Sequence, residues 1–249
     1  MITKEIINNS LLITLSRPEK RNALHPEMVA GLKSAFTESA DNKDIKSIIL
    51  TGAGDAFCAG ADLSYLKQFS NNSVIENEKD SESLAELFFQ IYNFNKPTVA
   101  AVNGAAIAGG CGLASVCDFI VAHPEDSKFG YSEVKIGFIP AIVSVFLLRR
   151  ISKSHAKQML LTGDIISGKR AYEIGFVNYL ADNVLGEAKN LAAKINKNSA
   201  LSTGLTKKMI HSVSDMNLNT AIDFCVNLNV ISRTSDDFKK GIQKFLNKE

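Results

Sequence analysis

The chain has 249 residues, a formal net charge of +2 and an ordinary composition, in which 45% of the residues are apolar and 22% are charged. This length suits one large α/β domain or two small ones, and the composition excludes disordered and fibrous proteins. The small net charge predicts no nucleic-acid partner, because such a partner requires a basic patch.

The targeting and redox features are those of a soluble protein. No apolar run approaches the roughly 18 residues of a membrane span, so no membrane partner is expected. The N-terminus lacks the basic start and long apolar region of a signal peptide. The four cysteines form no CxxC pair and the four histidines have no ligand spacing, so we expect reduced thiols, no metal site and a cytoplasmic location.

The first hundred residues alternate between strand-like and helix-like patterns. Residues 11–16 and 45–50 are apolar runs that predict strands, and apolar residues spaced by four predict a helix over 26–40. Residues 70–82 are polar and mixed in charge, which predicts a mobile surface loop of the kind that borders ligand sites. An amphipathic helix is expected over 84–94.

Residues 97–133 form the central stretch of the chain. A buried strand is expected over 98–102, and glycines follow at positions 104, 109, 110 and 112. Free N–H groups at a helix start near Gly109 suit a developing oxyanion, and a carboxylate follows at Glu133. On spacing alone, simple strand–helix packing explains these glycines equally well. Gly110 stands where a P-loop has lysine, and no GxGxxG occurs, so no dinucleotide is expected.

After residue 133 the pattern becomes mostly helical. Helices are expected over 140–150, 152–161, 167–174, 184–196, 199–214, 217–233 and 235–247, with a short strand over 176–180. The class is therefore α/β with a helical C-terminal appendage. The last three helices carry an apolar stripe that should be buried against the core or a partner: Leu201, Leu205, Met209, Ile222, Val226, Val230, Phe238, Ile242 and Phe245.

Four segments in order, RPEKRNAL, AFCAGADL, AAIAGGCGLASVCD and FGYSEVKIGFIP, resemble the enoyl-CoA hydratase/isomerase (crotonase) superfamily. The resemblance covers nearly the whole chain. It implies a crotonase (ClpP-like) spiral of β-β-α turns over residues 1–196 and a C-terminal helical trimerisation module over 197–249. It also implies an acyl-CoA thioester substrate, no metal or redox cofactor, and a homotrimer or a hexamer built as a dimer of trimers.

The same resemblance assigns roles to individual residues. Two backbone N–H groups, of Ala61 and Gly109, would form an oxyanion hole for the thioester oxygen. The residues expected to contact the substrate and its CoA moiety are Arg21, Ala23, Leu24, Ala61, Asp62, Leu63, Ser64, Gly109 and Gly110.

Typical hydratases of the family that this chain resembles use two glutamates as catalytic acids. The acidic residues of this chain depart from that pattern. Gly112 occupies the position of the first acid, and Glu133 that of the second. The small Gly112 would leave space for a water that Glu133 activates. The apolar residues that follow Glu133 in sequence predict partial desolvation and a raised pKa.

The segment SEVKIGFIPAIVSVFLLRR resembles the bacterial methylglutaconyl-CoA hydratase branch more than the IPGAGGTQRL of short-chain enzymes. Ile142, Val143 and Ser144 replace the small residues of that commoner pattern, which predicts a reshaped acyl end. Three readings stay open: a hydratase acting on a short or branched 2-enoyl-CoA, a 3-enoyl to 2-enoyl isomerase using Glu133, and a non-catalytic acyl-CoA-binding or scaffold protein.

Overall fold

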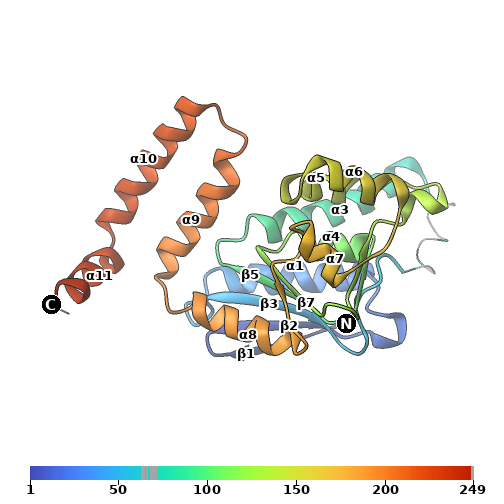
Figure 1. The fold of residues 1–249 in the computed structure, drawn as a ribbon, viewed down its shortest axis with the longest axis horizontal. Helices are drawn as coiled ribbons and strands as arrows, with labels where there is room; N and C mark the ends of the chain where they lie inside the picture. The colour runs from blue at the N-terminus through green and yellow to red at the C-terminus, as the bar shows by residue number, and fades with distance from the viewer. Residues whose placement is uncertain (63–64, 66, 68–71, 248–249) are drawn as a thin grey trace.

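The larger of two sheets forms the base of the molecule in the computed structural model, which describes residues 1–62, 65, 67 and 72–247 (Figure 1). Its strands lie in the order β1-β2-β3-β5-β7-β10. Their bounds are β1 Ile2–Ile7, β2 Ser10–Leu15, β3 Ser47–Gly52, β5 Thr98–Val102, β7 Phe119–Ala122 and β10 Tyr179–Leu180. The β1–β2 pair is antiparallel, and the later pairs are parallel. Buried apolar runs such as Thr98–Val102 are what a covered parallel sheet requires.

The smaller sheet has the order β4-β6-β8-β9. Its strands are β4 Ala56–Cys58, β6 Ala105–Ile107, β8 Lys128–Gly130 and β9 Ile166–Ser167. The chain visits the larger sheet, then the smaller sheet, then a helical segment, and repeats this path as β3-β4-α3, β5-β6-α4 and β7-β8-η2. The predicted α/β spiral of β-β-α turns is therefore confirmed.

Helices cover both faces of the larger sheet. On one face, apolar side chains of α8 (Val184–Ile195) pack against β3, β5 and β7. On the other face lies the main core, which includes side chains of α1 (Pro26–Ala40), α3 (Val74–Tyr92), α4 (Gly109–Ser115), α5 (Ala141–Arg150), α6 (Lys153–Thr162) and α7 (Gly168–Glu173). Short 3-10 helices occur at η1 (Pro18–Lys20) and η2 (Glu133–Ile136).

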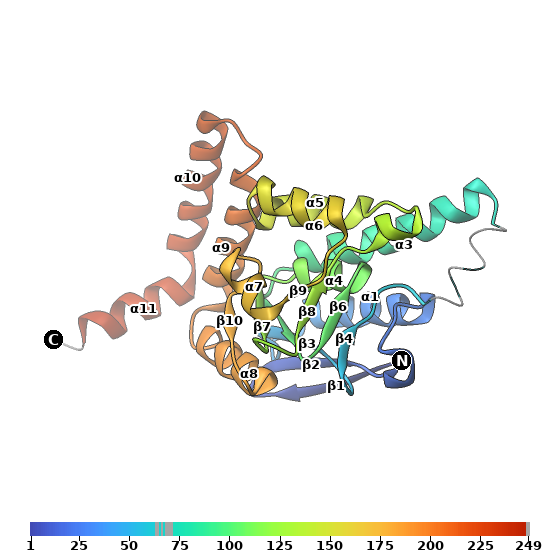
Figure 2. The same ribbon diagram turned by 45° about the vertical axis from the view of Figure 1, so that its right-hand side comes forward.

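The prediction of a loop over residues 70–82 is wrong from Val74 onward, because α3 begins there. Ser73 caps the helix with a capping box: its hydroxyl accepts from the Glu76 N–H, and the Glu76 carboxylate accepts from the Ser73 N–H. The first turns of α3 project away from the core, so their polar side chains face solvent (Figure 2). The mostly polar composition of this segment, in which even Val74 and Ile75 are exposed, reflects exposure rather than loop structure.

The last three helices are α9 (Ala200–Val213), α10 (Leu218–Thr234) and α11 (Asp236–Leu246), close to the predicted bounds. They extend away from the sheets, and α11 lies far from the core in both views (Figures 1 and 2). Much of the predicted apolar stripe is exposed, including Ile222 at 56%, Val226 at 54% and Phe245 at 73%. Burial of this stripe against the core is thus not found.

Candidate active site

Two of the sequence motifs lie side by side and form one wall of the candidate site. Leu24 and Ala61 pair as an isolated parallel bridge. The Leu24 N–H donates to the Gly60 carbonyl over 2.6 Å, and the Asp62 N–H donates to the Leu24 carbonyl over 3.1 Å. Ala23 and Leu24 are buried, whereas Arg21 is exposed. Leu63 and Ser64 lie outside the described residues.

The glycine turn before α4 packs closely against this wall. A Cβ atom on Gly109 would lie 3.1 Å from Leu24 Cδ1, and one on Gly110 would overlap the Cys58 carbonyl oxygen. Gly60 has φ of +92°, and its own Cβ would meet the Ile107 carbonyl oxygen at 2.9 Å. Glycine is therefore required here so that two backbone segments can approach each other. The structure brings Leu24, Ala61 and Gly109 together.

The amide groups of Ala61 and Gly109 are available as donors. Within the described part of the chain, neither N–H donates to a backbone carbonyl or a side chain. Gly109 is the first residue of α4, and Ala108 before it offers no side-chain cap. Ala108 adopts φ of 50° and ψ of −121°, a strained conformation for a residue with a Cβ. Such geometry leaves the first amide of the helix without an internal partner.

Glu133 opens η2 and is only 8% exposed. Its Oε2 atom has no hydrogen-bond partner among the described residues. Burial raises the pKa of the Glu133 carboxyl, because the charged form loses hydration without gaining a countercharge. A raised pKa lets a carboxyl group hold a proton more readily, which suits a general acid/base.

The raised pKa of Glu133 and its cause, desolvation, are confirmed, although most of the apolar residues expected to cover it are themselves exposed. The apolar residues after it in sequence are exposed, with Ile136 at 70%, Phe138 at 59% and Ile139 at 66%. The nearby groups are instead Tyr131 and Cys111, both fully buried. Burial is the main cause of their raised pKa values, and the charge of Glu133 raises both further. The charge of Glu133 thus acts on groups that lie in the buried core.

The space beside Gly112 is closed, contrary to the expectation that a water would fit there. A Cβ on Gly112 would overlap Val143 Cγ1 and would lie 3.0 Å from Phe88 Cε2. Val143 is 4% exposed and Phe88 is fully buried. Side chains of α5 and α3 therefore fill the volume that the missing acid would occupy.

A buried ion pair next to Ala61 was not foreseen from the sequence. Arg17 Nη2 lies 2.6 Å from Asp62 Oδ2, and the two side chains are 15% and 3% exposed. Asn22 joins the same loops: its Oδ1 accepts from the Arg17 N–H, and its Nδ2 donates to the Ala53 and Ala56 carbonyls. The expected contact of Asp62 with CoA stays a prediction, since its carboxylate is engaged with Arg17.

Arg150 holds the other end of α4. Its guanidinium donates to the Ser115, Cys117 and Phe176 carbonyls, at 3.3, 2.7 and 2.8 Å. A cation at a helix C-terminus satisfies the last carbonyls and the helix dipole. In the sequence, Arg150 is only the second of two arginines at the end of an apolar helix, so the sequence did not predict its contact with α4.

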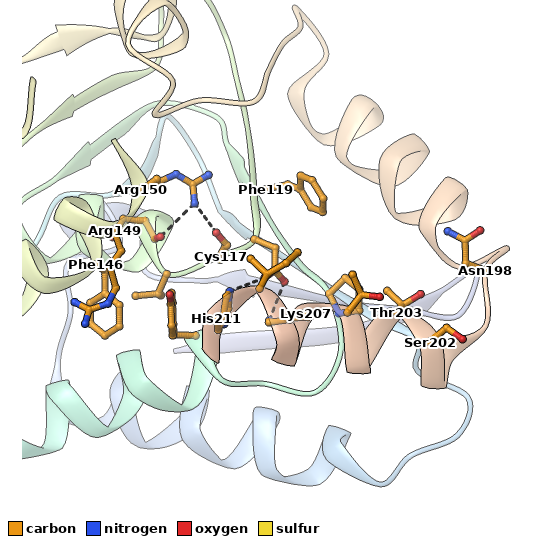
Figure 3. Close-up of a pocket in the computed structure, with 17 residues that line it drawn as sticks. Cys117, Phe119, Phe146, Arg149, Arg150, Asn198, Ser202, Thr203, Lys207 and His211 are labelled. Atoms are coloured by element: carbon orange, nitrogen blue, oxygen red, sulfur yellow. Dashed lines mark hydrogen bonds and ion pairs between the residues drawn. The ribbon is translucent and has the colours of Figure 1, made fainter. Parts of the chain in front are cut away.

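A cavity of about 620 Å³ separates α9 from the core (Figure 3). It is lined by Arg149, Arg150, Lys207 and His211 among others, but by none of Ala61, Gly109 and Glu133. Asp118 accepts from Lys207 Nζ over 2.8 Å and from the Thr98 N–H over 2.7 Å, and so joins α9 to β5. Asp118 therefore has a structural, hydrogen-bonding role. Its neighbours already satisfy its charge, and it is the only acidic residue among the described residues that line the cavity.

Other candidate groups are structural. Cys58 and Cys111 are fully buried, and burial raises the pKa of each thiol to about 12, which keeps them protonated and unreactive. Across the residues that the structure describes, no three His, Cys, Asp or Glu side chains gather in a metal-binding group. None of the described helices combines the length and apolar character needed to span a bilayer.

Comparison with known proteins places this geometry in a family. Residues 5–249 match the enoyl-CoA hydratase/isomerase family. A Thermus thermophilus protein named among the enoyl-CoA hydratases is 41% identical over 239 residues, covering 95% of this chain and 94% of the relative. The crotonyl-CoA hydratase of Syntrophomonas wolfei is 32% identical over 241 residues, with 95% and 91% covered.

Solved structures agree with the sequence comparison. The crystal structure of an enoyl-CoA hydratase from Polaromonas is 31% identical and superposes with a TM-score of 0.95, covering 100% of this chain and 97% of the other. The paired loops, the uncapped start of α4 and the buried Glu133 thus lie in a chain that shares the fold of a solved enoyl-CoA hydratase. The chain is a member of the enoyl-CoA hydratase/isomerase family.

Proposed function

We propose that this protein is an enoyl-CoA hydratase, which adds water to a short or branched 2-enoyl-CoA with Glu133 as its single acid/base. One observation carries the proposal. Among the described residues, the amides of Ala61 and Gly109 have no partner and lie in adjoining loops, and Glu133, further along the chain, is buried with a raised pKa. The names of the relatives support the hydratase class.

The proposed reaction needs one base and two donors. Glu133 takes a proton from water while the water oxygen forms a bond to C3 of the 2-enoyl thioester. The electron pair of the double bond moves toward the thioester oxygen, and the N–H groups of Ala61 and Gly109 stabilise the enolate there. Glu133 then returns its proton to C2. In other enzymes, loss of one such donor costs about 3 kcal/mol of transition-state stabilisation.

A second candidate is an isomerase that moves a double bond from the 3 to the 2 position. The closed space at Gly112 favours it, because proton transfer along an enolate requires one base and no water. Glu133 would remove a proton from C2 and return it to C4. Product analysis separates the two reactions, since hydration consumes the conjugated double bond and isomerisation creates it.

The test is a panel of purified 2-enoyl-, 3-enoyl- and 3-methylglutaconyl-CoA esters, assayed for both reactions. Turnover of 3-methylglutaconyl-CoA at least 10-fold above crotonyl-CoA would assign the chain to the methylglutaconyl-CoA hydratase branch that its α5 sequence resembles. No turnover of any ester, with acyl-CoA binding retained in calorimetry, would replace the enzyme proposal by the non-catalytic scaffold reading.

We also propose that the protein is a cytoplasmic homotrimer or dimer of trimers that needs no cofactor beyond the CoA of its substrate. The exposed apolar side chains on α10 and α11, such as Ile222 and Phe245, support assembly. A mass of 27.0 kDa by light scattering at micromolar concentration, the mass of one chain, would contradict it.

A further inference from the structure

We propose that Val143 is the residue that restricts this site to one acid, because its γ-methyl group occupies the volume into which a side chain at position 112 would project. The proposal rests on the proposed function of Glu133. It assigns to Val143 a specificity-determining role: the residue at 143 decides whether α4 can carry a second carboxylate.

The position of Gly112 explains why a side chain there would matter. Gly112 lies three residues after Gly109 on α4, and its N–H donates to the Ala108 carbonyl over 3.0 Å. Residues three apart share one face of a helix, and Cα–Cβ bonds tilt toward the helix N-terminus. A side chain at position 112 would therefore lean toward the amide of Gly109.

Val143 blocks that direction with little freedom to move. The Cβ of a residue at 112 would overlap Val143 Cγ1 and lie 3.1 Å from Val143 Cβ, whereas carbon atoms in contact are normally about 3.5–4.0 Å apart. Val143 lies in α5, and a valine in a helix strongly prefers a single χ1 rotamer. The γ-methyl therefore cannot rotate away without strain.

Phe88 closes the same space from α3 but is the lesser obstacle. Its Cε2 atom would lie 3.0 Å from the added Cβ, which a shift of a few tenths of an ångström relieves. Its ring is packed edge-on against Phe146 of α5, with ring centroids 6.2 Å apart. Val143 is therefore the larger steric obstacle to a side chain at position 112, and it is the residue to substitute in a test.

A double-mutant cycle tests the steric part without any substrate. Gly112→Ala, measured by thermal unfolding, should lower the melting temperature in the Val143 background and raise it in the Val143→Gly background, because glycine to alanine normally stabilises a helix interior. Gly241→Ala in α11, where a Cβ meets nothing within 4 Å, should give the same shift in both backgrounds. Val143→Ala serves as the background if Val143→Gly does not fold. Equal shifts for Gly112→Ala in both backgrounds would overturn the proposal.

A matched pair of double variants tests the chemical part. Gly112→Glu/Val143→Gly should hydrate crotonyl-CoA at least 10-fold faster in kcat/KM than Gly112→Gln/Val143→Gly, and its pH profile should show one additional ionisation. Equal rates and equal profiles in folded proteins would show that position 112 does not face the reacting atoms, and would overturn the role of Val143. A wild-type protein inactive on every ester would refute the proposed function while leaving the melting-temperature cycle unaffected.

Discussion

The spiral core and the last three helices differ in how they bury their apolar residues. In the core, all five residues of β5 and six of the seven residues of α4 are buried. Among the described residues, α9 and α10 each bury one residue, Lys207 and Leu228, and α11 buries none. Because helices gain most of their stability from packing, the core can stabilise itself, whereas α10 and α11 pack little within the chain, which is the reason for the proposed assembly.

The same two regions also hold different candidate functions: the core holds the candidate catalytic groups, and the last helices hold the surface proposed for assembly. The candidate catalytic groups lie within residues 61–133, inside the self-sufficient core. The last helices contribute the exposed stripe and one buried ion pair, Lys207 with Asp118, at 7% and 14% exposure. Perturbing each region should therefore change different measured quantities.

The largest expected effect is on activity and originates in the core. Glu133→Gln should lower kcat/KM on the preferred enoyl-CoA by about 10²- to 10⁴-fold, the usual contribution of a general acid/base. The size of the assembly should not change. Glu125→Gln, at an exposed position in the loop before β8, is the control and should keep wild-type kinetics. Wild-type turnover by Glu133→Gln on every ester would refute the assignment.

The next effect tests the junction between the two regions. Asp118→Asn leaves the buried Lys207 ammonium without its countercharge, which should lower the free energy of unfolding by about 3 kcal/mol in urea titrations. Asp215→Asn breaks the exposed pair with Arg149, 64% and 43% exposed, and should cost under about 1 kcal/mol. Similar losses for the two variants would show that α9 is not held by the buried pair.

Substitutions in the exposed apolar stripe should change the fold little but should clearly reduce the size of the assembly. The double variant Ile222→Asp/Val226→Asp should move the sedimenting species toward a single chain of 27.0 kDa while keeping the helical circular dichroism of the fold. Asn227→Asp adds a charge to the same helix, away from that stripe, and should leave the mass unchanged. An unaltered mass for the double variant would show that this face is not an interface.

The smallest effect follows from the raised pKa of Glu133. A carboxyl group whose pKa is higher in the folded than in the unfolded protein binds more protons when folded, so its contribution to stability falls as pH rises from about 4.3, the ordinary glutamate value. Glu133→Gln removes this cost and should have the higher melting temperature at pH 7. The advantage should disappear below pH 4; a lower melting temperature at pH 7 would contradict it.

Local signals predicted most helix bounds. Ser152, Ser167, Ser199 and Ser235 each cap the N-terminus of the helix expected after them, because a short polar side chain there satisfies a free backbone N–H. The motif segments also proposed Ala61, Gly109 and Glu133 as site residues, and the fold brings Ala61 and Gly109 into loops that both contact Leu24. The alternation of strands and helices was sufficient for the α/β class.

Tertiary structure decided the features that depend on distant neighbours. The spiral shows no fixed period in the sequence, because its turns differ in length between equivalent strands. Glu133 is buried, although Ile136, Phe138 and Ile139, which follow it in sequence, are exposed. The space at Gly112 is closed by Val143, 31 positions along the chain. The sequence by itself determined local conformation and residue types, since caps and periodicity act over a few residues, whereas burial and excluded volume depend on which segments the fold brings together.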